Sequence, residues 1–232
     1  MHIPDGFLTV AAAGPAWLLS AGGVGYCLKR AKEKMEDRAI PLMGVLAAFI
    51  FVAQMINFPV IGGTSGHLLG GVLIAVMLGP FAGAIVMTTV LIVQCLIFQD
   101  GGLTTLGANI LNLSLVATIG GYGIYRLVRG RSTDPRRILF AIFLAAWISI
   151  IMAAAACALE LAFSGTSPLH VVLSAMVGIH LIIGLGEGII TVLLAGFILK
   201  VRSDLFFPQV QPVLPGMSGR NVHEPHSFGD EK

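Results

Sequence analysis

The chain has 232 residues, of which 56% are hydrophobic and 11% are charged, with a mean hydropathy of +0.90. Soluble domains carry roughly a quarter charged residues, so this composition excludes one large water-soluble core and indicates a protein whose solvent is a lipid bilayer. The formal net charge of +2 is too small to indicate a class of partner, and we expect no nucleic acid. The three cysteines, Cys27, Cys95 and Cys157, match no metal or redox spacing, and we interpret them as apolar packing residues.

The chain opens with a short polar segment, residues 1–6, ahead of the first apolar run. It contains an acid, Asp5, and no basic residue, so it lacks the basic start of a secretory signal peptide, and we expect it to stay uncleaved. Pro4, Asp5 and Gly6 predict a tight turn, which would fold the first residues back towards the mouth of a helical bundle.

The apolar runs that follow predict membrane-spanning helices, because about 20 apolar residues cross a hydrocarbon core ~30 Å thick. The run 68–98 would be ~46 Å long as one helix, and Gly79-Pro80 inside it favours a break. The predicted spans are then 7–28, 42–58, 68–79, 81–98, 105–125, 138–163 and 170–200.

The placement of lysine and arginine supports this break. All 14 of them fall in three segments, 29–38, 126–137 and 200–232, and cytoplasmic flanks of membrane proteins collect such residues. If these segments share one side, an even number of spans must separate the first two, and the break gives four spans where an unbroken helix gives three. We therefore expect an all-α integral membrane protein with seven transmembrane helices, its N-terminus outside and its C-terminus cytoplasmic. We expect residues 1–202 to form a single transmembrane domain and residues 203–232 to form a flexible cytoplasmic tail.

His2 is the residue that most strongly suggests metal chemistry. The α-amine of Met1, the amide nitrogen of His2 and its imidazole are close in covalent terms, and they can close two fused chelate rings around one ion if the amide gives up its proton. Three nitrogens in a plane, completed by a fourth, suit Ni(II) and Cu(II) better than Mg, Ca or tetrahedral Zn. A histidine near a start codon can also be accidental, so the interpretation needs a fourth ligand on the same side of the membrane.

His67 is the candidate for that fourth ligand. It lies in a glycine-rich segment, 61–68, that enters the third predicted span on the outer side, where the N-terminus is also expected. The alternative is that His67 caps a helix or bonds a nearby carbonyl. Asp5, Thr64 and Ser65 are candidates for supporting contacts around the ion. Asp5 would orient a histidine ring or balance the charge of the ion, or else only form the turn.

Ionisable residues within the predicted spans are functional candidates, because charge is costly inside a bilayer. Glu160 is expected near the outer end of its span, where water can reach it. Glu187 lies midway along the last span, and we expect it to contact a neighbouring helix through His180 or Asn109.

Three stretches of the sequence resemble the CbiM/NikM family, the substrate-capture (S) components of nickel and cobalt energy-coupling factor transporters. They are MHIPDGFL at 1–8, GGTSGHLLG at 62–70 and QDGGLTTLGAN at 99–109, and the resemblance covers residues 1 to about 202. It implies a six-helix capture core with an extra N-terminal helix, in the cell membrane of a prokaryote. It also implies a metal held by the Met1 amine, the His2 amide and imidazole, and the His67 imidazole.

The same resemblance implies partners and a cargo. The partners would be a membrane coupling (T) subunit, paired cytoplasmic ATP-binding-cassette ATPases and a small accessory membrane subunit. The cargo would be Ni(II), which Pro4-Asp5 favours, or alternatively Co(II). The chain itself has no Gly-x-x-x-x-Gly-Lys-Ser/Thr phosphate-binding loop and no common hydrolase motif, so we expect neither an ATPase of its own nor a resident cofactor.

Two other classes of function stay open at this point. A secondary transporter or channel for another solute would use Glu187 and His180 inside the last span, without any ATPase. A metal-dependent membrane enzyme would use His2 and His67, but a square-planar site leaves no in-plane position for water or substrate.

Overall fold

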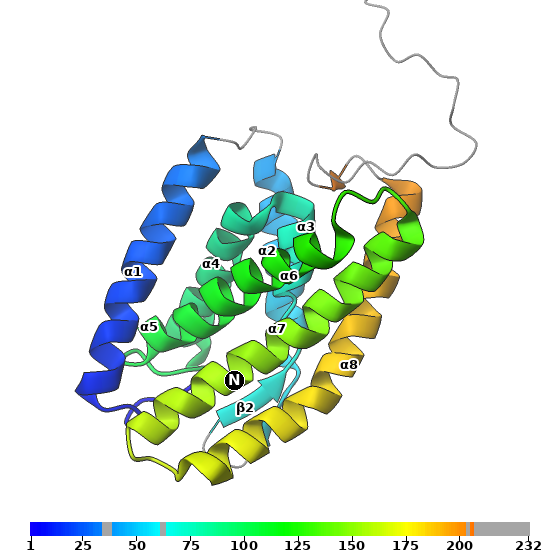
Figure 1. The fold of residues 1–232 in the computed structure, drawn as a ribbon. Helices are drawn as coiled ribbons and strands as arrows, with labels where there is room; N and C mark the ends of the chain where they lie inside the picture. Colours follow the sequence, from blue (N-terminus) through cyan, green and yellow to red (C-terminus); the bar gives the residue numbers. More distant parts are fainter. Residues whose placement is uncertain (34–38, 61–63, 203–204, 207–232) are drawn as a thin grey trace, which may run out of the picture.

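The computed structural model describes residues 1–33, 39–60, 64–202 and 205–206, and these form a bundle of helices with one small hairpin (Figure 1). The hairpin consists of strands β1 (Asn57–Val60) and β2 (Thr64–His67). The helices are α1 (Val10–Lys32), α2 (Ala39–Met55), α3 (Gly71–Leu78), α4 (Pro80–Phe98), α5 (Leu106–Asn109), the π-helix η1 (Ile110–Ile119), α6 (Gly120–Arg129), α7 (Pro135–Phe163) and α8 (Leu169–Val201).

Within the described ranges, three helices are long and apolar enough to cross a membrane, namely α4, α7 and α8. Helix α2 is apolar but has 17 residues, and α3 has only 8, which is about 12 Å of helix. Helices α5, η1 and α6 follow one another without a gap from Leu106 to Arg129. The chain is therefore a multi-pass membrane protein, while seven full crossings remain a prediction.

The structure breaks the helix at Gly79-Pro80. Helix α3 ends at Leu78, Gly79 has φ +86° and ψ 162°, and Pro80 is the first residue of α4. Only glycine adopts such a φ readily, and proline is suited to the first turn of a helix because it has no N–H to leave unbonded. The break lets α3 and α4 pack closely, since a Cβ added at Gly83 would lie 3.1 Å from the Cα of Ala75.

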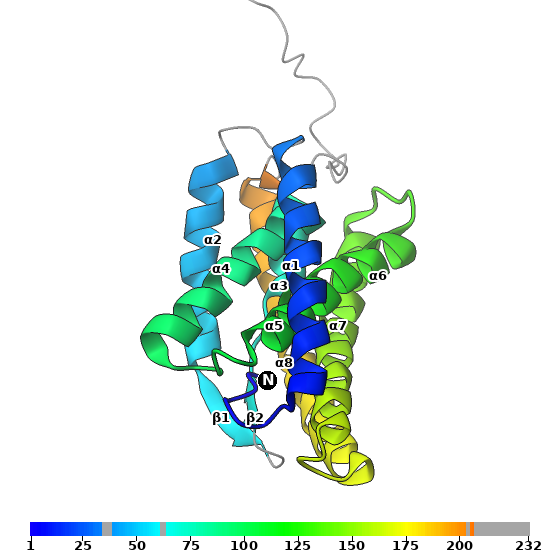
Figure 2. The same ribbon diagram turned by 90° about the vertical axis from the view of Figure 1, so that its left-hand side faces the viewer.

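The ends of the helices and the loops gather at two opposite ends of the bundle (Figures 1 and 2), and these ends differ in charge. The last turns of α1, α6 and α8 carry the basic side chains and lie at one end, here named the basic end. The hairpin, the 99–105 loop, the 164–168 loop and the N-terminus gather at the opposite end, here named the site end. The described parts of the three basic segments thus lie at one end, as the sequence predicted, while the side of the membrane that each end faces stays a prediction.

The hairpin is a departure from the expected all-α fold. The sequence analysis predicted a span to residue 58 and the next from residue 68, with no strand between them, whereas residues 57–60 and 64–67 pair as antiparallel strands, with Asn57 opposite His67. Four-residue strands without alternating apolar residues give little sequence signal. The pairing matters because it places His67 at the C-terminal end of β2, directly before the turn (residues 68–70) into α3.

Candidate metal centre

The first three residues are buried in the bundle rather than exposed at its surface. Met1 and Ile3 have no exposed area, and His2 is 4% exposed. The side chain of Asn109 hydrogen-bonds both backbone groups of Ile3. Its Oδ1 accepts the Ile3 N–H at 2.8 Å, and its Nδ2 donates to the Ile3 carbonyl at 3.2 Å. The Ile3 carbonyl also accepts the N–H of Gly102 at 2.9 Å and the hydroxyl of Thr105. The N-terminus is therefore fixed by backbone hydrogen bonds that do not depend on its side chains.

Asp5 fastens the same segment to the 99–105 loop. Its carboxylate accepts the N–H of Leu103 at 3.0 Å, and both the N–H of Thr104 at 2.7 Å and its hydroxyl. These hydrogen bonds hold the pKa of Asp5 below its usual range. Gly102 allows the close approach, because a Cβ there would lie 2.3 Å from the Asp5 nitrogen. In the part of the chain that the structure describes, the hydrogen bonds of Asp5 reach this loop and not a histidine ring, so Asp5 positions the segment.

The imidazoles of His2 and His67 lie against each other. Their ring centroids are 4.7 Å apart and their planes are inclined by 18°. His67 is 1% exposed, and its Nδ1 lies 2.7 Å from the carbonyl oxygen of Leu68. A carbonyl only accepts, so Nδ1 carries the proton and Nε2 carries the lone pair. Within the part of the chain that the structure describes, this buried Nε2 has no hydrogen-bond partner. A lone pair in that position is available to a metal ion.

Asp100 is a site residue that the sequence analysis missed. Its Oδ1 lies 3.3 Å from His2 Nδ1, and its Oδ2 accepts a hydrogen bond from Asn57 Nδ2 at 3.4 Å. The sequence showed it only as one of the two acids in the segments expected outside. That scarcity of charge was a usable signal, because a carboxylate beside a histidine ligand can balance the charge of a bound cation.

The nitrogen groups of the site are held in their neutral forms. Burial lowers the pKa of the Met1 α-amine to about 5. Burial, together with the neighbouring amine, lowers the pKa of His2 to about 3 and that of His67 well below its usual range. Neutral amine and imidazole nitrogens carry a lone pair at pH 7, and the neutral form is the one that binds metal.

This candidate centre differs from a site made only of side chains. The described residues contain no group of three or more His, Cys, Asp or Glu side chains that could hold a metal ion. The candidate set, the Met1 amine, the His2 amide and imidazole and the His67 imidazole, takes two of its four nitrogens from the backbone. Thr64 and Ser65 belong to β2, but their side chains fall outside what the structure describes.

Glu187 does not make the contact that we expected from the sequence. Its two carboxylate oxygens accept the backbone N–H groups of Leu69 at 2.6 Å and Gly70 at 2.8 Å, and not His180 or Asn109. His180 Nδ1 lies 2.6 Å from the Met176 carbonyl on its own helix. The motive for a secondary transporter, an acid and a histidine acting together inside the last span, is therefore weakened.

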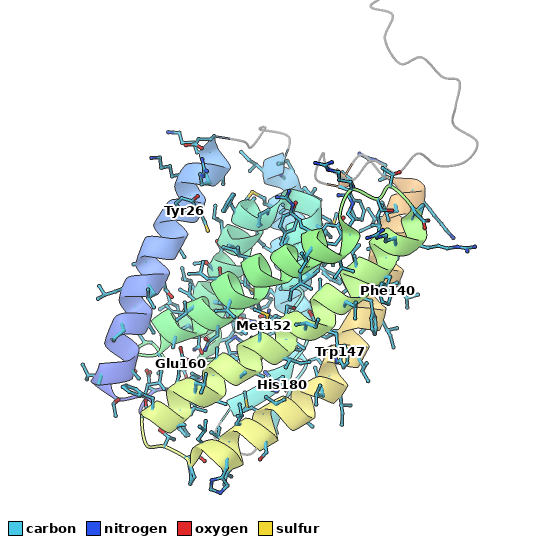
Figure 3. All side chains as sticks on the ribbon, viewed as in Figure 1. Tyr26, Phe140, Trp147, Met152, Glu160 and His180 are labelled. Atoms are coloured by element: carbon cyan, nitrogen blue, oxygen red, sulfur yellow. The ribbon has the colours of Figure 1, made fainter. Side chains whose placement is uncertain are left out.

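Glu160 and His180 lie on different helices in Figure 3, Glu160 on α7 and His180 on α8. Glu160 is half-buried and accepts a hydrogen bond from Asn112 Nδ2 at 2.6 Å, so it faces the bundle as well as the outer end of its helix.

Of the predicted tail, 203–232, the structure describes only 205–206.

Replacing Asn109 with Ala is expected to release the N-terminal segment. The N–H of Ile3 loses its acceptor, and a buried group without a partner costs about 1–3 kcal/mol. We expect faster hydrogen exchange at the Ile3 amide and a lower unfolding temperature in detergent. Asn112→Ala is the matched control, since Asn112 bonds Glu160 and not the N-terminus. Equal exchange at Ile3 in both variants would contradict the role given to Asn109.

An apolar helical bundle with a buried N-terminus beside a histidine defines a multi-pass membrane protein with a candidate metal site. Comparison with known proteins identifies its family. The profile of the CbiM family, described as the cobalt uptake substrate-specific transmembrane region, matches residues 2–205, and the chain belongs to this family. It is thus a metal-uptake component of the prokaryotic cell membrane, as the sequence resemblance indicated.

Individual relatives agree with this assignment. A metal transport protein of Haloquadratum walsbyi is 38% identical over 91% of this chain and 95% of its own length. A fused nickel transport protein, NikMN, of Archaeoglobus fulgidus is 40% identical over 91% of this chain and 70% of its own length. The crystal structure of a truncated transition metal transporter has a TM-score of 0.81 and 32% identity, covering 87% of this chain and 99% of that one.

Proposed function

We propose that this chain is the substrate-specific, metal-binding subunit of an ATP-driven energy-coupling factor importer. It captures Ni(II), with Co(II) as the second candidate, from outside the cell. The observation that carries the proposal is the contact of the His2 and His67 rings, 4.7 Å apart, beside a buried N-terminus. The name of the Archaeoglobus fulgidus relative favours nickel, and the family description favours cobalt.

The ligand set explains a preference for nickel. The Met1 amine, the His2 amide and the His2 Nδ1 close a five-membered and a six-membered ring on one ion, and His67 Nε2 supplies the fourth nitrogen. Four nitrogens in a plane suit Ni(II) and Cu(II). With the amide deprotonated, the complex keeps one positive charge, which the carboxylate of Asp100 would balance from its place beside His2.

The topology supports import. The basic end is cytoplasmic by the positive-inside rule, so the site end faces outwards and receives metal from there. The chain has no phosphate-binding loop, so energy comes from partners. These are a membrane coupling (T) subunit, cytoplasmic ATP-binding-cassette ATPases and a small accessory membrane subunit.

A competition titration tests the proposal. Purified protein is titrated with Ni(II), Co(II), Cu(II) and Zn(II) against a chelator of known affinity, and absorption spectra are recorded. We expect one ion per chain, a yellow Ni(II) complex, and Zn(II) bound much more weakly than Ni(II). Equal affinity for Zn(II) and Ni(II), or no binding of Ni(II), would contradict the proposal.

At pH 7, binding of Ni(II) is expected to release about one proton. The pKa of the Met1 amine is already lowered to about 5 and that of His2 to about 3, so only the His2 amide has a proton to lose. If the Met1 amine had an ordinary pKa of about 8 and the imidazole one of about 6.5, the same ligand set would release about two protons or more. The affinity should fall about tenfold per pH unit down to pH ~5, and more steeply below it, because the amine then binds a second competing proton. Calorimetry in buffers of different ionisation enthalpy counts the protons, and release of two at pH 7 would contradict the neutral site.

A further inference from the structure

The turn that follows His67, residues 68–70, is hydrogen-bonded by a carboxyl group of helix α8. Glu187, near the middle of α8, is 1% exposed. Its Oε2 accepts the N–H of Leu69 at 2.6 Å, and its Oε1 accepts the N–H of Gly70 at 2.8 Å. Burying a carboxyl group is costly unless it is hydrogen-bonded, and here the two backbone donors offset part of that cost.

The same turn is held from its other side. Gln54 of α2 donates through Nε2 to the carbonyl of Leu69 at 2.8 Å. Gly70 has φ +75°, a left-handed conformation in which the chain leaves β2 and enters α3. A Cβ at Gly70 would overlap Cδ1 of Ile50, so the Gly70 backbone packs against an α2 side chain. Side chains of α2 and α8 thus hydrogen-bond the backbone of Leu69 and Gly70, in the turn that follows His67.

We propose that Glu187 is a positioning residue for the metal centre. By holding the N–H groups two and three residues after His67, it fixes the turn whose Leu68 carbonyl orients the His67 ring. The lone pair on Nε2 is thereby kept where it completes the ligand set. This inference rests on the proposed function, since it concerns the same ion.

The geometry also gives α8 a place in release. Helix α8 runs from the site end to the basic end, where Lys200 lies in its last turn (Figure 1). A movement of α8 that draws Glu187 away from the turn removes both of its hydrogen bonds at once and loosens the turn on that side, while Gln54 still holds Leu69. Glu187 therefore links α8, which reaches the basic end, to the turn that follows His67.

E187Q tests this inference, because glutamine keeps the shape but has only one acceptor oxygen, and its NH₂ group would face an N–H. We expect Ni(II) affinity to fall at least about tenfold, with an absorption spectrum at saturation that shifts towards that of His67→Ala. In metal-free protein we expect faster hydrogen exchange at the amides of Leu69 and Gly70. E187D, which keeps the charge on a side chain one methylene shorter, should show the same changes to a smaller degree. E160Q is the matched control and should behave as wild type.

The outcomes separate this inference from the proposed function. Wild-type protein that binds Ni(II) while E187Q and E187D bind it with the same affinity and spectrum overturns the inference alone. Weaker binding with a wild-type spectrum and unchanged exchange at Leu69 and Gly70 also overturns it, because the loss is then a general destabilisation. Wild-type protein that binds no Ni(II) overturns the proposed function, and the positioning role with it.

Discussion

A protein extended by three glycines ahead of Met1 is expected to lose high-affinity Ni(II) binding. The extension converts the α-amine into an amide and moves the free amine away from His2, so the fused chelate cannot form. The α-amine is buried in the structure and has its pKa lowered to about 5, which prepares it as a neutral ligand. Joining ligands on one short segment typically raises affinity by about 10² to 10⁴-fold, and we expect a loss of that order.

The control for this experiment is the same extended protein after its extension has been cleaved off. A protease site placed so that cleavage leaves Met1 as the first residue restores the free amine without changing any other atom of the chain. Affinity should return on cleavage. If the extended and the cleaved proteins bind Ni(II) equally well, the α-amine is not a ligand, and the chelate at the N-terminus is wrong.

His67→Ala is expected to have the second large effect. It removes the buried Nε2 that lies beside the His2 ring and leaves three nitrogens and an open position in the plane. Loss of a residue that only supports a ligand commonly costs 10–100-fold in metal affinity, so loss of the ligand itself should cost more than about 100-fold. Residual binding should show a changed absorption spectrum, because water replaces nitrogen.

His180→Ala is the matched control for that variant. His180 is equally buried, but its Nδ1 contacts the carbonyl of Met176 on its own helix. Affinity close to that of wild type is expected from it. Should His180→Ala and His67→Ala weaken binding to the same degree, the effect would come from loss of a buried side chain and not of a ligand.

The helices were predictable because their signals are local. Length, apolar runs and the placement of basic residues located the helices closely, and Gly79-Pro80 marked the break between α3 and α4. The sequence also placed His2 and His67 at the same end of the bundle, and the structure brings their rings together. Their service as ligands remains a prediction.

The contacts that hold the site were not predictable, because each joins residues far apart in the sequence. Asn109 bonds Ile3 across 106 positions, and Glu187 bonds Leu69 across 118. A single sequence shows that Glu187 is an intramembrane acid but not which backbone groups it will meet. Asp100 stood out only by its charge. It lies against His2 because the 99–105 loop packs over the N-terminal segment.

X-ray absorption and magnetic measurements on the Ni(II)-loaded wild-type protein test the central claim most directly. The account predicts a diamagnetic, four-coordinate, planar Ni(II) with only nitrogen neighbours. A paramagnetic, six-coordinate ion with oxygen neighbours would contradict it, because the Met1 amine, the His2 nitrogens and the His67 ring would then not form one plane around the metal.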